Sequence, residues 1–260
     1  MIIIKTPEEI NKMRKGGKIL ALIFEELSQA IRSGVSAFAL NKLAEELADQ
    51  YQVVPAFKGY IPDGLRKIKK QGFPAAICVS VNTEVVHGLP VREKIIQEGD
   101  IVGLDMGIKY QDYFLDKAVT LGVGSISDKA KKLITITNQA LEKAIQKIKP
   151  GIYLGDISAT IQEYIEQNNF SVVRDLTGHG IGKKLHEDPA IFNFGKSGTG
   201  QVLKEGMVLA IEPMVNAGDY KIKTLSDDWT IVTADGSLSA HFEDTVLVTK
   251  NGAEVLTKLG

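Results

Sequence analysis

The residues best suited to chemistry in this chain are its histidines and a few acidic residues in apolar surroundings. The sequence has only four histidines in 260 residues, and each stands within two positions of glycine or an acidic residue. Four carboxylates lie in or beside strand-like apolar sequence, where an unpaired charge would be costly. Nitrogen and oxygen donors without a thiolate suit divalent cations, and two neighbouring cations would indicate metal-assisted hydrolysis. The candidates are His87, His179, His186, His241, Asp105, Asp116, Glu212 and Glu243.

The spacing of Asp105 and Asp116 limits where they can stand. They are eleven positions apart, an odd number, so they cannot share one face of a single strand. They fit two strands of a hairpin whose turn lies near residues 109–112. A single aspartate at a strand end is most often a solvated residue, and it is the pair that favours a ligand role.

His179 lies inside a glycine-rich run at residues 178–182. The spacing of the run is not that of a dinucleotide-binding fingerprint, and no strand–loop–helix frame surrounds it. We therefore expect its glycines to let the backbone come close to a histidine ligand. His186 follows seven positions later, which favours a contact with substrate over a ligand role. His241 shares a strand face with Glu243 by two-residue alternation, and no role is assigned to it.

The elements that must position these residues follow one order twice: two helices, then strands. Residues 6–33 begin with a helix cap, a proline and a glutamate, and continue with helical apolar spacing. Further helices are predicted over 36–50, 128–148 and 156–167, the last capped by Asp156. Strand patterns occupy 76–81, 100–106 and 113–121, and β-type sequence returns after the fourth helix.

One segment of each half matches the other. Residues 98–105 and 205–212 both begin with Glu-Gly and end on a carboxylate after an apolar run. A duplicated, two-fold pseudo-symmetric fold would bring Asp105 and Glu212 to opposite sides of one central site. The alternative is that two buried strands resemble each other by chance. Because no linker-like stretch separates the halves, we expect a single catalytic domain over residues 1–260.

Composition excludes several classes of protein. With 44% hydrophobic content, the chain is predicted to be globular. Its 31 basic and 32 acidic residues nearly balance, so its overall charge does not indicate binding to nucleic acid or to an anionic membrane. The basic run at 66–70 is more typical of a solvated loop than of a nucleic-acid site. The single cysteine, Cys78, excludes an intrachain disulfide framework and cysteine-based zinc sites. The apolar start is too short for a signal peptide, so we expect a cytoplasmic protein.

Taken in chain order, the motifs resemble methionine aminopeptidase of type I in its short bacterial form. The resemblance covers nearly the whole chain, and its ligand positions occur in the right order and spacing. The motifs are residues 82–90 with His87, Asp105 with Asp116, residues 178–182 with His186 and Pro189, residues 207–214 with Glu212, Trp229, and residues 243–245 with Glu243.

The resemblance implies an α+β pita-bread fold, with two pseudo-symmetric halves of antiparallel sheet backed by helices. It also implies two divalent metal ions per chain, with cobalt, manganese, iron and zinc all open as their identity. Asp105 would chelate one ion, His179 and Glu212 the other, and Asp116 and Glu243 would bridge both. The implied activity is removal of the initiator methionine from nascent proteins and peptides with a small second residue.

The resemblance assigns further roles around the metals. Glu212 would also move a proton, His186 would steady the carbonyl oxygen, and His87 would contact the scissile amide. Substrate-binding positions would be His87, Phe73, Cys78, Leu185, His186 and Trp229. Leu185 departs from the family, which usually has an aromatic residue there, so a looser methionine pocket is expected. Residues 61–70 look like an insertion at the pocket rim.

The resemblance also suggests partners and competitors. The expected partner is the N-terminus of a peptide or nascent chain, ribosome docking is left open, and the protein is expected to be a monomer. A proline-specific aminopeptidase or prolidase shares the fold and ligands but normally carries a large N-terminal domain. A non-catalytic pita-bread binding protein would be expected to lack ligands, and all five are present here.

Overall fold

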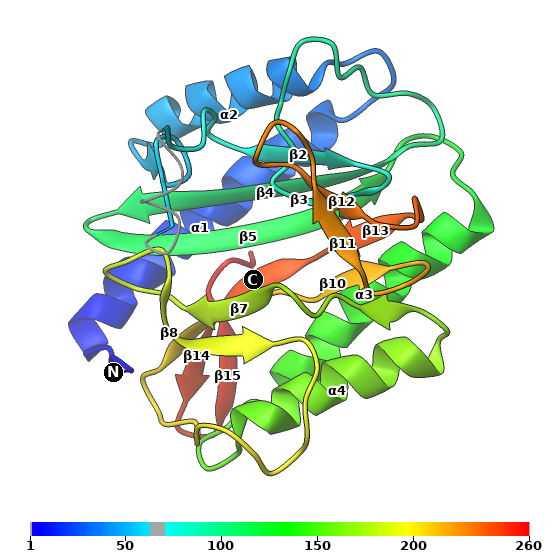
Figure 1. The fold of residues 1–260 in the computed structure, drawn as a ribbon. Helices are drawn as coiled ribbons and strands as arrows, with labels where there is room; N and C mark the ends of the chain where they lie inside the picture. Colours follow the sequence, from blue (N-terminus) through cyan, green and yellow to red (C-terminus); the bar gives the residue numbers. More distant parts are fainter. Residues whose placement is uncertain (1, 63–70, 260) are drawn as a thin grey trace.

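The computed structural model describes residues 2–62 and 71–259. Most of the expected insertion at residues 61–70 therefore lies outside the described residues. A curved antiparallel sheet crosses the molecule, with helices packed against it in two pairs (Figure 1). The path of the sheet is β1 (Val54–Pro55), β4 (Ile101–Tyr110), β5 (Tyr113–Gly122), β14 (Glu243–Thr249), β9 (Val208–Ile211), β7 (Thr177–Gly180) and β8 (Glu187–Phe192).

Shorter strands complete the β structure. β2 (Cys78–Val81) pairs with β4, and β15 (Gly252–Val255) pairs with β14. One small sheet contains β13 (Ser239–His241), β10 (Met214–Asn216) and β6 (Ser171–Val172). Another contains β11 (Ile222–Thr224), β12 (Ile231–Thr233) and β3 (Glu84–Val86). An antiparallel sheet with two pairs of helices packed against it confirms the α+β class.

The helices are α1 (Pro7–Ala30), α2 (Ala37–Gln50), α3 (Asp128–Lys147) and α4 (Leu154–Gln167). At the start of α1, Thr6 and Glu9 form the capping box that the sequence predicts. The helix ends at Ala30, short of the predicted residue 33, because Ile31 is already extended. The predicted cap of α4 is wrong: Asp156 lies inside the first turn, where it accepts from the backbone N–H of Tyr153 at 2.8 Å.

The two matching segments occupy equivalent places in the sheet. β5 and β14 are neighbours at its centre, with β4 beyond the one and β9 beyond the other. Gly99 and Gly206, the turn glycines before β4 and β9, have positive φ of 90° and 84°. Each donates its N–H across the sheet at 2.9 Å, to Val123 and Val248 respectively. This arrangement agrees with the predicted duplication.

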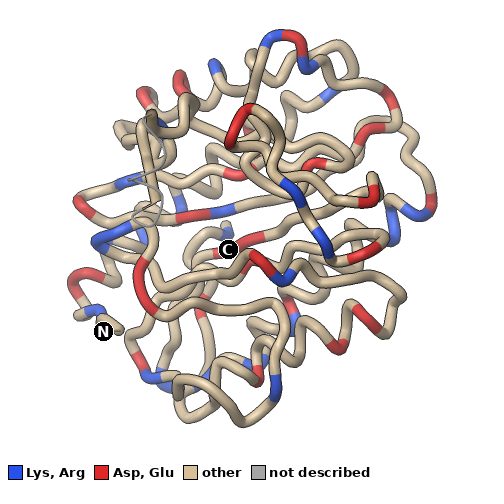
Figure 2. The backbone as a smooth tube through the Cα atoms, viewed as in Figure 1, with Lys and Arg blue, Asp and Glu red and all other residues tan. Residues whose placement is uncertain are grey.

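Each half has its own core. One core joins α1 and α2 to β4 and β5, and the other joins α3 and α4 to β9 and β14. Burial of apolar area of this kind is the main favourable term in folding. Acidic and basic positions are interspersed along both halves in the view of Figure 2, which agrees with the near-zero net charge of −1. In the described residues, no helix is long and apolar enough to cross a membrane.

Candidate metal centre

The β4–β5 hairpin places two of the predicted ligands on one face of the sheet. Its turn residues, Gln111 and Asp112, have φ of 46° and 70°, the left-handed pair that a two-residue hairpin requires. In the resulting register Asp105 stands opposite Ala118, and Asp116 stands opposite Gly107. Directly opposed residues share a face, so the two aspartates do as well. The predicted hairpin is confirmed.

Pairing with β14 adds Glu243 to the same face. Glu243 stands opposite Ala118, which is itself the partner of Asp105. The neighbouring pair, Lys117 and Asp244, must then point to the reverse face. They form an ion pair of 2.6 Å there.

β9 and β7 bring the remaining two ligands. Ala210 stands opposite both Thr245 of β14 and His179 of β7, so His179 faces the same way as Glu243. Glu212 follows the last residue of β9 and has the same alternation as Ala210. All five predicted ligands therefore meet on one face, as the sequence prediction requires.

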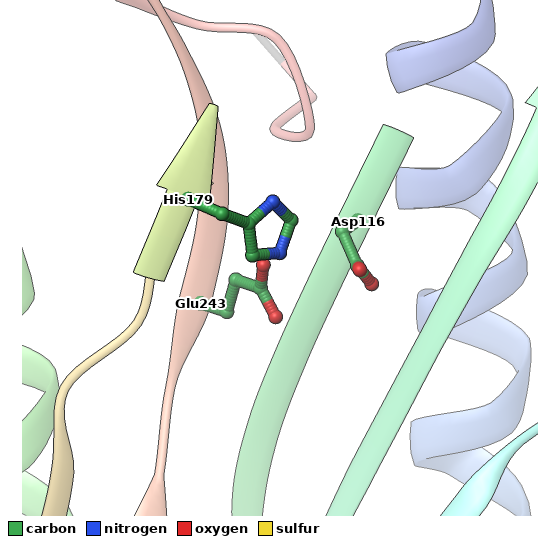
Figure 3. A group of neighbouring side chains, drawn as sticks. All are labelled: Asp116, His179 and Glu243. Atoms are coloured by element: carbon green, nitrogen blue, oxygen red, sulfur yellow. The ribbon is translucent and has the colours of Figure 1, made fainter. Parts of the chain in front are cut away.

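Two groups of side chains converge closely enough to hold a cation. Donor atoms of Asp116, His179 and Glu243 lie within 4.8 Å of one another, and Figure 3 shows these three side chains as neighbours that come from separate strands. Donor atoms of Glu212, Glu243 and His241 form a second such group. His179 Nε2 is 3.5 Å from Glu212 Oε1, which connects the two groups. Asp105 is outside both groups.

Contacts with neighbouring backbone and side chains hold the predicted ligands in place. The hydroxyl of Thr245 accepts from Asp116 N–H at 2.9 Å and donates to its carbonyl at 2.8 Å. His179 Nδ1 lies 2.8 Å from the carbonyl of Gly180, which directs Nε2 toward Glu212. A Cβ at Gly178 would collide with the carbonyl of Ala210. The expected close approach of backbone beside His179 is confirmed.

Without a cation, the charged forms of the clustered carboxyl groups are disfavoured. Burial raises the pKa of Asp105 to about 7. Burial, and then the charge of nearby carboxylates, raises the pKa of Asp116, Glu212 and Glu243 well above the usual range. Burial lowers the pKa of His179 to about 3, so its imidazole is neutral and able to bind metal.

Several buried donor atoms have no partner within the described part of the chain. They include Asp105 Oδ1 and Glu243 Oε1, both withdrawn from water. A buried carboxylate oxygen without a hydrogen bond is costly, and a bound cation would satisfy it. The donor set of carboxylates and neutral imidazole is one that divalent cations accept. The residues present therefore fit divalent metal.

The sequence left His241 without a role, and the structure places it at the centre. Its Nε2 is 3.8 Å from Glu212 Oε2 and is a further buried atom without a hydrogen bond among the described residues. Burial, then the charge of His87, lowers its pKa to about 3. The only sequence signal was its alternation with Glu243, which is a common strand pattern.

A cavity of about 730 Å³ opens onto the cluster. The predicted substrate positions all line it: His87, Phe73, Cys78, Leu185, His186 and Trp229. Phe73 and Trp229 contact edge to face, with ring centroids 5.3 Å apart. Burial raises the pKa of the Cys78 thiol well above its usual range, so Cys78 is a wall residue rather than a nucleophile.

Two lining residues behave differently from the rest. Leu185 is only 2% exposed and also packs into the core beneath α1, so it is part wall and part core. His186 lies in a more exposed position, with its ring centroid 4.4 Å from that of His179. Tyr60, which the sequence prediction missed, has its hydroxyl 2.5 Å from His186 Nδ1.

The fold and the cluster together define a metallopeptidase. The model of metallopeptidase family M24 matches residues 11–250. The chain is 49% identical to the methionine aminopeptidase of Clostridium perfringens over 99% of both chains. It is 52% identical to the solved methionine aminopeptidase of Thermotoga maritima, with a TM-score of 0.94 and 100% of each chain covered. The chain belongs to the methionine aminopeptidase family and has the pita-bread fold.

A prolidase comparison is weaker. The solved prolidase of Pyrococcus horikoshii is 26% identical with a TM-score of 0.78, and the match covers 100% of this chain but 65% of the prolidase. The shared fold therefore extends to prolidases, while the higher identity and full coverage favour the methionine aminopeptidases.

Proposed function

We propose that this protein removes the N-terminal methionine from peptides and nascent chains by metal-dependent hydrolysis. The observation that supports this best is the meeting of five buried or nearly buried proposed ligands, four within strands β4, β5, β7 and β14 and one directly after β9, at the base of a cavity with an apolar, partly aromatic wall. A thioether side chain suits such a wall, because sulfur is polarisable and packs well beside aromatic rings. We propose one catalytic domain over residues 1–260.

For the metal, we propose two divalent ions per chain. Asp116 and Glu243 would contact both, His179 and Glu212 would hold one, and Asp105 the other. When bound, such ions polarise a carbonyl group and lower the pKa of water. The identity of the ion among cobalt, manganese, iron and zinc is a matter for measurement.

The protein side chains orient the substrate and move the proton. Glu212 lies 3.5 Å from His179 Nε2 and reaches the cavity, so it can hold and return a proton at its carboxylate oxygen. His87 and His186 line the cavity and are proposed to contact the scissile amide and its carbonyl oxygen. Phe73, Cys78, Leu185 and Trp229 are proposed to hold the methionine side chain.

The substrate is proposed to need a small second residue, and the partner is the N-terminus of a peptide or nascent chain. We propose that the enzyme works as a monomer in the cytoplasm, independently of nucleic acid or membrane. Ribosome docking is compatible with this substrate, but it is not required by the proposed chemistry.

The test is hydrolysis of Met-Ala-Ser by chelator-treated protein titrated with each divalent metal. Cleavage after the methionine that returns with metal would support the proposal. Preference for Ala-Pro dipeptides under the same conditions would identify a prolidase-like enzyme instead. Metal binding by calorimetry without cleavage of either substrate would indicate a non-catalytic binding protein.

A further inference from the structure

Tyr60 and His186 come from distant parts of the chain and meet at the wall of the cavity. The Tyr60 hydroxyl oxygen is 2.5 Å from His186 Nδ1, and the two rings are tilted with centroids 5.2 Å apart. Both residues line the cavity that leads to the metal ligands. With Nδ1 facing Tyr60, the other ring nitrogen of His186, Nε2, is the one able to meet substrate.

The hydrogen bond can run in either direction, and chemistry favours one. A neutral imidazole carries its proton on one nitrogen only, and the partner of the other nitrogen decides which. A phenol O–H is a stronger acid than the N–H of a neutral imidazole, so the phenol is the favoured donor. If Tyr60 donates to Nδ1, the imidazole proton stays on Nε2. An Nε2–H group can donate to a carbonyl oxygen, whereas a bare Nε2 cannot.

The backbone of Tyr60 is fixed where the chain leaves and returns to the cavity wall. Gly59 N–H donates to the carbonyl of Phe73 at 2.7 Å, and Phe73 N–H donates to the carbonyl of Tyr60 at 3.0 Å. Tyr60 N–H donates to the carbonyl of Phe57 at 2.9 Å. A Cβ at Gly72 would collide with the backbone of Gly59. The chain segments before and after this loop therefore lie so close together that only glycine fits at position 72.

His186 is fixed from the other side. Its neighbour Glu187 forms an ion pair of 2.8 Å with Lys5, and both side chains are almost fully buried, at 4% and 3% exposure. The other carboxylate oxygen of Glu187 accepts from Lys184 N–H at 3.1 Å. The ring of His179 contacts His186 edge to face. The hydroxyl and the imidazole are thus both held by anchored backbone rather than by a chance surface contact.

We propose that Tyr60 is a positioning residue for His186: its hydroxyl donates to Nδ1 and so keeps the imidazole proton on Nε2, directed at the substrate carbonyl. The kinetic part of this proposal rests on the peptidase function proposed above. The tautomer part concerns the protein itself and can be measured without substrate.

The direct test is the tautomer of His186, read from long-range proton–nitrogen NMR spectra of nitrogen-15-labelled protein at a pH where the ring is neutral. His186→Gln identifies the signal by its loss. Wild type is expected to show the Nε2–H pattern, and Tyr60→Phe, which keeps the ring and removes the hydroxyl, a shift toward Nδ1–H. Tyr113→Phe is the matched control, since it removes a phenol that donates to Glu9 outside the cavity. An Nδ1–H pattern in wild type, or no change in Tyr60→Phe, would overturn the proposal.

The kinetic test is a double-mutant cycle on a methionyl tripeptide with metal-loaded protein. Partners that orient functional histidines around metal sites are worth about 10- to 100-fold, so Tyr60→Phe is expected to lower kcat roughly 10-fold with little change in KM. In a His186→Ala background the same substitution should have no further effect. Effects that multiply, or a change confined to KM, would show that Tyr60 only lines the pocket. If wild type fails to cleave the tripeptide, the proposed function is wrong, while the NMR result still decides the tautomer.

Discussion

Lys117 and Asp244 form an ion pair of 2.6 Å directly behind the carboxylates proposed to bridge the metals. Each is the sequence neighbour of a residue proposed to bridge the metals, Asp116 or Glu243, and strand alternation sends the pair to the opposite face. The pairing of β5 with β14 has only two residue pairs in register, and this is one of them. The face of the sheet that carries the proposed metal ligands and the face that carries this ion pair therefore depend on the same short pairing of β5 with β14.

The first prediction is that Lys117→Met destabilises the protein and weakens metal binding. Asp244 is 14% exposed, and losing its cation leaves the carboxylate with the hydroxyl of Thr257 as its described hydrogen-bond donor. We expect a loss of about 1–3 kcal/mol in the free energy of unfolding, measured by urea titration in chelator. Adding Asp244→Asn should recover much of this loss. A fully stable Lys117→Met protein with unchanged metal affinity would show that the pair does not support the strand register.

The second prediction concerns pH in the metal-free protein. A carboxyl whose pKa is raised on folding binds more protons in the folded state, so its contribution to stability declines as pH rises. For Asp105 the decline runs from the ordinary value of 3.8 to about 7. We expect chelator-treated protein to have a Tm lower at pH 8 than at pH 5.5, by on the order of 5 °C.

Divalent metal should reverse this dependence, because cations replace the bound protons and bind better as pH rises. Asp105→Asn is the matched control: it keeps the shape and removes the titration, so its Tm should vary less with pH. An equal pH dependence in wild type and Asp105→Asn would contradict the assignment to the metal cluster.

Much of this site could be predicted because its signals are local. The odd spacing of Asp105 and Asp116, with turn-forming residues between, specifies a hairpin and its two-residue loop. The capping box at Thr6 and Glu9 fixes where α1 begins. These features depend on residues a few positions apart, and elementary geometry is enough to interpret them.

The features that the sequence missed depend on distant contacts. His241 joins the cluster through the position of Glu212, and Tyr60 reaches His186 across 126 positions. Alternation along a strand predicts on which face of the sheet a side chain lies, but not which residue from a distant part of the chain lies next to it. Asp156 looked like a helix cap, yet α4 begins two residues earlier, at Leu154, and the Asp156 side chain accepts from Ser197 and Gly198 as well as from Tyr153 N–H. The contacts with Ser197 and Gly198 span 41 and 42 positions, so local spacing does not indicate them.

A third prediction separates His179 from His186. His179→Ala should weaken metal binding directly, because its neutral Nε2 points into the cluster. His186→Ala should retain most of the metal affinity and lower kcat by about 10²- to 10³-fold, the usual cost of one transition-state contact. Calorimetry of metal binding beside steady-state kinetics distinguishes them. Equal loss of metal in both variants would refute the division of roles.

A fourth prediction tests the proposed bridges. Asp116→Ala or Glu243→Ala should abolish activity, because each removes a residue proposed to contact both metals. The protein should stay folded, because each substitution also removes one of several buried carboxylates that repel one another. Circular dichroism and urea titration in chelator check the fold, and a metallated assay checks turnover. Near-normal turnover in either variant with metal restored would make the bridging arrangement wrong.

The last prediction concerns Leu185, where the sequence resemblance leads us to expect an aromatic residue. Leu185 lines the cavity but is also 2% exposed and packed in the core, so a larger ring must find space on one side or the other. Overpacking a core position costs about 1–3 kcal/mol, and Leu185→Phe should lower the free energy of unfolding within that range.

If the ring turns toward the cavity, the ratio of kcat/KM for methionyl over leucyl peptides should rise, by up to about 10- to 200-fold, because one apolar pocket contact is worth about 1–3 kcal/mol. Leu185→Met is the matched control, since it nearly conserves volume and should change stability little. Parallel assays of both peptides with urea titrations decide between the two positions: an unchanged ratio with lowered stability would place Leu185 in the core alone, and the pocket assignment would be withdrawn.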